Sequence, residues 1–437
     1  MGRSLLVLVL LLAGCTTSPP LKETPHHPQA ATPYGTNVPL PGGLPQHDLP
    51  PLKAKPARCV QPSSTAGDIR PLYRRSGWVK VSTLPRANLV DDFDVAPDGA
   101  VWMQTQWLDD ASGRQETQIR RWYANEWQDF PRPSIGPPGG VNYVGVLGAA
   151  SARQVWAFGS TIERVEGVIE MGNSRMFLGT LQDGRWSDVV FTAPETRGIQ
   201  AEVGILARGT WAFAGDPVAL HWDGSGWKSH KLRGTLGVVD VGGEGDNIWA
   251  LRGDRDAPAD QPTLIRWMGR GWQPILLPAL GGPALGSTPE AFPIDVAANA
   301  PDDVWVTGFV EWGMDNEDDD YEDGPLRARP VALHWDGAAW TCLWGPMSWV
   351  FDDAEPDGRG GLWVVASQGG AAELWHLSGG RWTRTRLPAG KGQHAFVSKL
   401  VKRAGTSEVY AAGYIGRNVD YQGSIDPSQH ATLWRIR

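Results

Sequence analysis

The chain has 437 residues, with 48 acidic and 40 basic side chains and a formal net charge of −8 at pH 7. Hydrophobic residues make up 41%, and Trp occurs 23 times, Gly 54 times and Pro 35 times. Nothing in this charge balance favours binding to nucleic acid or to an anionic surface through bulk charge, so neither is expected.

The first residues have the pattern of an export signal. Arg3 is followed by an unbroken run of Leu and Val from Leu5 to Leu12, and then by Ala-Gly-Cys. Eight apolar residues span about 12 Å as a helix, far short of the roughly 20 residues that a bilayer crossing requires. We therefore expect residues 1–14 to be a signal peptide that is removed, and not a transmembrane helix.

The tetrapeptide Leu-Ala-Gly-Cys at residues 12–15 resembles the lipobox of bacterial lipoproteins, in which the thiol receives a diacylglycerol before cleavage. The resemblance implies that acyl chains such as palmitate on Cys15 anchor the mature chain to a membrane. The next residue is Thr16 and not Asp, which implies the outer membrane of a bacterial cell envelope. The alternative is an ordinary signal peptide with a chance cysteine.

A Pro-rich segment follows the anchor and continues to about Pro62, with few large apolar residues. This composition is typical of an extended tether. We assign residues 15–69 to the lipidated Cys and its tether, and residues 70–437 to one folded block. Length would allow two domains, but internal repeats favour a single closed array.

Two patterns alternate along the folded block. The first is a short apolar strand centred on an aromatic residue, with copies at Trp102, Trp156, Trp211, Trp249, Trp305, Trp363 and Tyr410. The second is a strand and tight turn that end on a Trp, with copies at Trp127, Trp186, Trp227, Trp272, Trp340 and Trp382. Several of these turns contain Asp-Gly, which tolerates positive φ. The first pattern recurs about every 51 residues, which is the length of a propeller blade.

The ends of the block complement each other. The seventh unit has a strand at residues 431–436 but lacks the last turn and Trp, and a matching strand stands at residues 76–81. We predict that the strand at Trp78 pairs with the strand at Trp434, so that an N-terminal strand closes the ring. The tether should then leave the ring at the outer edge of the seventh blade.

These patterns predict an all-β fold, a seven-bladed β-propeller with four-stranded blades in which the periodic Trp side chains form the core. The combination of Val-Trp-Ala, Leu-His-Trp-Asp-Gly and a second Trp resembles the tryptophan-rich propeller repeats of bacterial secreted and surface proteins. It is similar in style to kelch and galactose-oxidase-like repeats. The resemblance covers residues 70–437 and implies an architecture, not an activity.

Four carboxylates recur near the start of the innermost strands, at Asp94, Asp240, Asp295 and Asp353. Innermost strands line the central channel of a propeller, so this set could bind a cation or a polar ligand. The alternative, which we favour, is that each Asp accepts backbone hydrogen bonds within its own blade.

Three His residues stand directly before the third-strand anchor of their units, at His221, His334 and His376. Arg121 and Arg266 occupy the same place in two other units. Equivalent positions are spread around a ring, so we do not expect these side chains to converge on a metal or to act as bases.

Two features remain open. The acidic run from Asp315 to Asp323 is interpreted as a solvated loop, because an EF-hand frame starting at Asp319 puts Tyr321 and Pro330 where calcium ligands are needed. Cys59 and Cys342 could form a disulfide outside the cytoplasm that straps the tether to the ring. The sequence does not show whether these two cysteines meet.

No nucleophile elbow, His-Glu-x-x-His motif or phosphate-binding glycine loop occurs, so we assign no catalytic residue, metal or cofactor. The sequence favours a membrane-anchored, extracytoplasmic binding or scaffold propeller whose partner is a glycan, a peptide or an envelope protein. The alternative is a carbohydrate-active hydrolase or lyase in which carboxylates from several blades act as acid and base.

Overall fold

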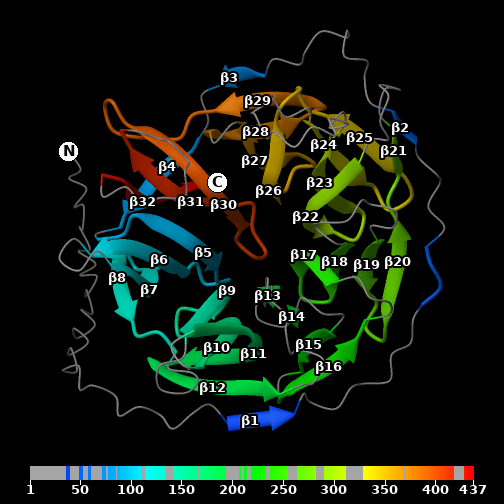
Figure 1. Ribbon diagram of the computed structural model, residues 1–437. Coiled ribbons are helices and arrows are strands. Elements are labelled where there is room, and N and C mark those ends of the chain that lie inside the picture. The colour runs from blue at the N-terminus through cyan, green and yellow to red at the C-terminus, as the bar shows by residue number, and fades with distance from the viewer. Residues whose placement is uncertain are drawn as a thin grey trace, which may run out of the picture. The chain divides into compact units, whose positions relative to one another are not determined.

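A computed structural model shows seven antiparallel sheets that follow one another as the blades of a propeller (Figure 1). No helix occurs among the residues that it describes. These residues are 36–39, 49–52, 58–60, 71–74, 77–84, 86–109, 114–133, 141–165, 168–192, 206–207, 211–213, 218–223, 225–232, 237–253, 263–281, 290–311, 328–368, 371–417 and 428–437.

Each blade places its strands in chain order from the inside of the ring to the outside. Blades 1 and 2 are β5 (Leu89–Val95), β6 (Val101–Asp109), β7 (Arg114–Tyr123) and β8 (Glu126–Phe130), then β9 (Val141–Ser151), β10 (Gln154–Val165), β11 (Val168–Gln182) and β12 (Arg185–Thr192). Blades 3 and 4 are β13 (Leu206–Ala207), β14 (Trp211–Phe213), β15 (Val218–Trp222) and β16 (Trp227–Lys231), then β17 (Gly237–Glu244), β18 (Asn247–Gly253), β19 (Thr263–Trp267) and β20 (Trp272–Leu276). Blades 5 and 6 are β22 (Glu290–Ala300), β23 (Asp303–Glu311), β24 (Ala328–Trp335) and β25 (Trp340–Trp344), then β26 (Val350–Pro356), β27 (Leu362–Gln368), β28 (Ala371–Ser378) and β29 (Arg381–Thr385).

Blade 7 combines strands from the two ends of the folded block. Its inner strands are β30 (His394–Lys402), β31 (Val409–Gly416) and β32 (His430–Ile436), and its outermost strand is β4 (Val79–Thr83). In the antiparallel pair of β32 and β4, Trp434 lies opposite Lys80 and Arg435 opposite Val79. The predicted closure is therefore confirmed. Innermost strands of successive blades contact one another, and β30 contacts β5, so the ring has no open seam.

The core consists of seven apolar clusters among the described residues, and each cluster lies between two neighbouring blades. Second-strand side chains such as Trp102, Trp211 and Trp249 are at most 1% exposed. A Trp side chain buries a large area, and a blade has no apolar interior of its own. The regular Trp spacing therefore follows from the need to pack every blade against the next.

The fourth-strand Trp residues also join the blades by hydrogen bonds. The indole N–H of Trp382 in blade 6 donates to the carbonyl of Trp344 at the end of blade 5, at 3.3 Å. Trp186 in blade 2 donates in the same way to Pro131, which follows blade 1, at 2.6 Å. At the seam, Trp127 of blade 1 donates to the Ser82 hydroxyl of β4 at 2.9 Å. The strand from the N-terminal side thus takes the place that blade 7 requires.

The described segments before β4 lie along the outer edges of the blades, and we call them the belt (Figure 1). Its described parts are β1 (Thr36–Pro39), residues 49–52, β2 (Arg58–Val60) and β3 (Leu72–Arg74). β1 pairs in parallel with β12 of blade 2, and β3 pairs in parallel with β29 of blade 6. Between them, Leu52 donates its N–H to the Pro274 carbonyl of blade 4 at 2.9 Å.

The belt differs from the free tether that the sequence predicts. Residues 36–39 contact blade 2, so the chain does not first meet the ring at blade 7. The outermost strand of a blade presents unpaired backbone groups, and a Pro-rich segment can still pair with them through its own backbone. That pairing needs no apolar periodicity, so composition alone suggests a spacer.

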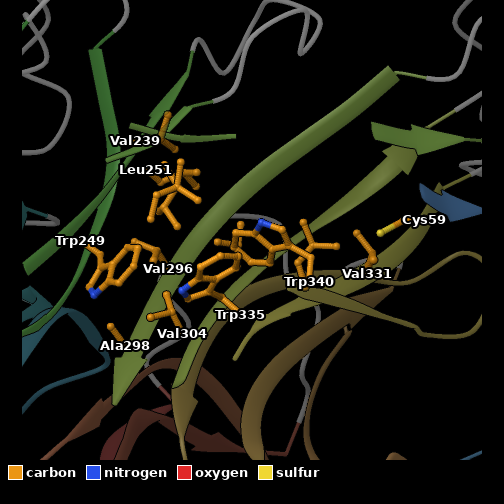
Figure 2. Close-up of a cluster of buried hydrophobic side chains, with 14 of the residues drawn as sticks. Cys59, Val239, Trp249, Leu251, Val296, Ala298, Val304, Val331, Trp335 and Trp340 are labelled. Atoms are coloured by element: carbon orange, nitrogen blue, oxygen red, sulfur yellow. The ribbon is translucent and has the colours of Figure 1, made fainter. Parts of the chain in front are cut away.

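A disulfide between Cys59 and Cys342 fastens the belt to blade 5, with the two Cα atoms 5.7 Å apart. β2, which carries Cys59, pairs in parallel with β21 (Ala279–Gly281). The Cys59 side chain is 2% exposed and belongs to the apolar cluster of blades 4 and 5, together with Trp335 and Trp340 (Figure 2).

The described residues include no helix that is both long and apolar enough to span a membrane.

Candidate functional site

The innermost strands line a central channel, and all four carboxylates that the sequence assigns to it border one cavity. This cavity has a volume of about 110 Å³. Its lining comes from β5, β17, β22, β26 and β30, among other strands. The four carboxylates are those of Asp94, Asp240, Asp295 and Asp353, and Lys399 of β30 lies beside them.

The carboxylates of blade 1 bind the backbone of blade 2. Asp94 Oδ2 accepts the N–H of Ala149 at 2.7 Å, while its Oδ1 accepts the N–H of Val95 in its own strand at 2.7 Å. Two residues earlier, Asp92 Oδ2 accepts the N–H of Leu147 at 2.6 Å. The hydrogen bond within its own blade that the sequence predicts is present at Asp94. The hydrogen bonds to the next blade were not predicted.

The same contact recurs farther around the ring. Asp240 Oδ2 of blade 4 accepts the N–H of Val296 in blade 5 at 2.7 Å. Asp353 Oδ2 of blade 6 accepts the N–H of Leu400 in blade 7. Burial raises the pKa of both carboxyl groups, but an Asp oxygen accepts a backbone N–H in either protonation state. These carboxylates therefore tie the innermost strands of neighbouring blades together.

Asp295 is the exception, because its carboxyl group faces that of Asp240. Burial raises the pKa of Asp295 well above its ordinary value, and the nearby charge of Asp240 raises it further. Burial also raises the pKa of Asp240, while the hydrogen bond from Asp295 opposes this shift. Two carboxyls at one buried site do not both ionise readily, so we expect the pair to share one proton, carried by Asp295.

We expect Asp295→Asn to stabilise the protein at neutral pH. The raised pKa means that folded Asp295 keeps its proton above the ordinary Asp pKa, so wild-type stability falls as pH rises through the folded pKa. Asn stays neutral and can still donate to Asp240. The gain should be present at pH 8 and should vanish towards pH 4, as measured by urea unfolding. A gain independent of pH would contradict the shared proton, and Asp183→Asn at an exposed turn is the control.

Lys399 lines this cavity and binds Asp92 beside it, and sequence patterns predict neither residue. The ammonium of Lys399 in blade 7 binds Asp92 Oδ1 in blade 1. Burial lowers the pKa of Lys399, but the charge of Asp92 outweighs burial and raises the pKa above its ordinary value. One lysine in one blade leaves no repeating signal, so only the ring geometry identifies this pair.

The turn between β30 and β31 reaches across one end of the channel (Figure 1). Gly405 in this turn donates its N–H to the Glu244 carboxylate of blade 4 at 3.0 Å. The Lys402 ammonium binds Asn299 Oδ1 of blade 5 at 2.6 Å. Blade 7 is therefore linked to blades on the other side of the ring, and this turn narrows the channel mouth.

The three predicted His side chains lie in different blades, each stacked on the second-strand Trp of its own blade. The ring centroids of His334 and Trp305 are 4.1 Å apart, and those of His376 and Trp363 are 4.0 Å apart. His221 stacks on the Trp of blade 3 at 4.4 Å. The guanidiniums of Arg121 and Arg266 lie over the equivalent Trp rings of blades 1 and 4. The His residues therefore do not converge.

No group of three or more His, Cys, Asp or Glu side chains within the described ranges is arranged to hold a metal ion. Cys15 and the acidic run from Asp315 to Asp323 lie outside those ranges.

A larger cavity, of about 600 Å³, lies where blade 6 meets the end of β32. Its lining includes His376, whose Nε2 is 2.8 Å from Asp357 Oδ2. Burial raises the pKa of Asp357, but this hydrogen bond and those from the backbone N–H groups of Gly361 and Arg359 outweigh burial and lower it. Four arginines also border the cavity, which no sequence pattern predicts.

No protein-family model matches the chain, and no curated protein matches it in sequence. Solved structures with a similar strand arrangement include an α-L-arabinanase of Penicillium chrysogenum complexed with arabinobiose, with 11% identity, coverage of 84% of this chain and 98% of that chain, and a TM-score of 0.38. An α-L-arabinofuranosidase from Fusarium graminearum has 9% identity, coverage of 85% and 98%, and a TM-score of 0.41. The β-propeller domain of the Trilobed protease from Pyrococcus furiosus has 7% identity, coverage of 80% and 94%, and a TM-score of 0.43. At these scores the likenesses carry no argument about activity.

Proposed function

We propose that this protein is a binding propeller of the bacterial cell envelope, anchored to the outer membrane through lipid on Cys15, whose partner is a glycan, a peptide or an envelope protein. The main support for this proposal is that the channel carboxylates form hydrogen bonds between neighbouring blades. Asp94, Asp240 and Asp353 accept backbone N–H groups of the following blades, so holding the ring together already accounts for these three acidic residues without a catalytic role.

The size of the channel cavity supports the same conclusion. At about 110 Å³, it is smaller than the roughly 300 to 1,000 Å³ typical of ligand pockets. A glycosidase needs its two carboxylates on either side of a bound sugar ring. The shared proton of Asp240 and Asp295 would suit a catalytic acid, but the cavity beside it has room for only a few water molecules.

The disulfide supports a location outside the cytoplasm. Structural disulfides form and persist in oxidising compartments and are rare in the cytosol. The Cys59–Cys342 bond joins the belt to the ring, and it agrees with the export signal and lipobox at residues 1–15.

Binding and catalysis are separated by offering the purified full-length chain to panels of envelope glycans and envelope proteins. We expect saturable binding without release of new reducing ends from any glycan. Glycan cleavage that is lost in Asp295→Asn but kept in the exposed-turn variant Asp183→Asn would overturn the proposal in favour of a hydrolase.

Lipid anchoring is tested by metabolic labelling with a palmitate analogue. We expect the wild-type chain to be labelled and Cys15→Ser to carry no label, because the thioether and the cleavage that follows it both require that thiol. Cys342→Ser is the matched control and should remain labelled. Continued labelling of Cys15→Ser would refute the anchor.

A further inference from the structure

The larger cavity, at blade 6, has the dimensions of a ligand site. Its volume of about 600 Å³ lies within the range of small-molecule pockets. The stacked rings of His376 and Trp363 form part of its lining, with the Asp357 carboxylate held against His376. This part of the wall is fixed by contacts within blade 6.

The rest of the wall is strongly cationic. Arg359 lies in the turn before β27, Arg381 begins β29, and Arg74 ends the belt strand β3, and all three line the cavity. The side chains of these arginines are exposed and form no hydrogen bond or ion pair with any described residue. A fourth arginine, Arg437, is held by Glu408 at 2.9 Å.

Within the described part of the chain, no carboxylate pairs with the guanidinium of Arg74, Arg359 or Arg381. Asp357 is the only acidic residue in the described lining, and its oxygens already accept hydrogen bonds from His376 and from the backbone of Arg359 and Gly361. Gathering like charges at one site costs stability, and no hydrogen bond or ion pair with a described residue offsets that cost for these three side chains. Their convergence is therefore best explained by an anionic ligand.

Hydroxyl groups complete the wall. Ser378, at the end of β28, and Ser407, in the turn before β31, are exposed and line the same cavity. Hydroxyls donate and accept hydrogen bonds, as sugar hydroxyls do. Guanidinium forks bind carboxylate and sulfate groups in bidentate fashion. A concave site of limited volume in a chain of net charge −8 favours a short anionic segment over a long polyanion such as nucleic acid.

We propose that this cavity binds an acidic oligosaccharide, with its carboxylate or sulfate groups against Arg74, Arg359 and Arg381 and its hydroxyls against Ser378 and Ser407. The inference rests on the proposed binding function and names its ligand class. Arg74 lies on β3, which pairs with β29, so the belt completes the site.

Calorimetric titration of the purified full-length chain tests the site. The probes are an oligogalacturonate, a sulfated oligosaccharide, a neutral maltooligosaccharide and inorganic sulfate. We expect one or both acidic oligosaccharides to bind, with an affinity that falls as salt rises, and the tighter of the two identifies the anionic group. The neutral oligosaccharide should not bind, and inorganic sulfate should bind at least tenfold more weakly.

Two charge reversals locate the binding. Arg359→Glu and Arg381→Glu should each weaken it at least tenfold, as expected for loss of a charge-assisted hydrogen bond. Arg270→Glu is the matched control, because Arg270 is exposed in the corresponding outer turn of blade 4, and it should leave affinity unchanged. All three side chains are exposed, and unchanged thermal unfolding shows that the variants fold.

The possible failures are distinct. No binding of either acidic oligosaccharide, equal binding of inorganic sulfate, or undiminished binding by both reversal variants would overturn this site. If a neutral glycan or an envelope protein binds instead, this ligand assignment falls while the general binding function stands. Cleavage of an oligosaccharide by the chain would overturn the binding function itself.

Discussion

Cys342→Ala is expected to lower the free energy of unfolding by about 2 to 5 kcal/mol, the range for loss of a native disulfide. The Cys59–Cys342 bond spans 283 residues of sequence, and a loop of that length lies at the upper end of the entropic effect in the chain-entropy account. Cys342 is half-buried, whereas Cys59 is 2% exposed among the side chains of blades 4 and 5. The substitution therefore removes the covalent link and leaves the packing of Cys59 intact.

Urea unfolding measures this effect, and a reductant provides the control. Dithiothreitol should lower the stability of the wild-type chain to that of Cys342→Ala and should leave the variant unchanged. Limited proteolysis adds a local readout, since loss of the strap should speed cleavage of the belt near β2. Equal stability of the oxidised wild-type chain and the variant would contradict a stabilising role for the Cys59–Cys342 disulfide.

Asp92→Asn is expected to cost about 2 to 4 kcal/mol, because removing one partner of a buried ion pair leaves the other charge uncompensated. The Asp92 side chain is 4% exposed and that of Lys399 is 35% exposed, so solvent screens part of the loss. Asp92 also accepts the N–H of Leu147 in blade 2. This one carboxylate therefore joins blades 7, 1 and 2 next to the ring closure.

A double-mutant cycle with Lys399→Met separates the ion pair from the rest of the effect. Unfolding free energies should show that Asp92→Asn costs less when Lys399 is already Met, because no ammonium is then left without its main partner. Glu126→Gln, at an exposed carboxylate in the same blade, should stay within about 0.5 kcal/mol of the wild type. Additive losses in the cycle would show that Asp92 and Lys399 are not coupled.

The channel carboxylates explain why acidic residues at a propeller centre need not indicate catalysis. The innermost strands converge around the channel, and each has few neighbours on its open side. A short carboxylate can accept an N–H of the next innermost strand, as Asp240 does from Val296. This bond joins the innermost strands of two blades, and it uses an acidic residue near the start of the strand.

The position of residues along the innermost strands predicts much of the candidate site. Asp94, Asp240, Asp295 and Asp353 recur at one place in their repeats, and they do border one cavity. The sequence does not predict which backbone groups these carboxylates bind, because a hydrogen bond to the next blade depends on how the two blades are oriented. Lys399 occurs in one blade alone, and a single residue has no periodicity from which to predict a role.

The number of blades and the closing strand follow from the order of residues along the chain. Each blade must bury a large aromatic side chain, Trp in six units and Tyr410 in the seventh, against its neighbour. The spacing of these residues therefore counts the blades, and the outer strand missing from the last unit is found at Trp78. The belt and the arginine cavity follow only from the folded arrangement. Backbone pairing of β1 or β3 requires no particular side chain. Arg74 lines the same cavity as Arg359 and Arg381 because β3 lies beside β29. Contacts that repeat in every blade produce a periodic sequence pattern, so they can be predicted from it. A contact that occurs once, between distant segments, produces no such pattern.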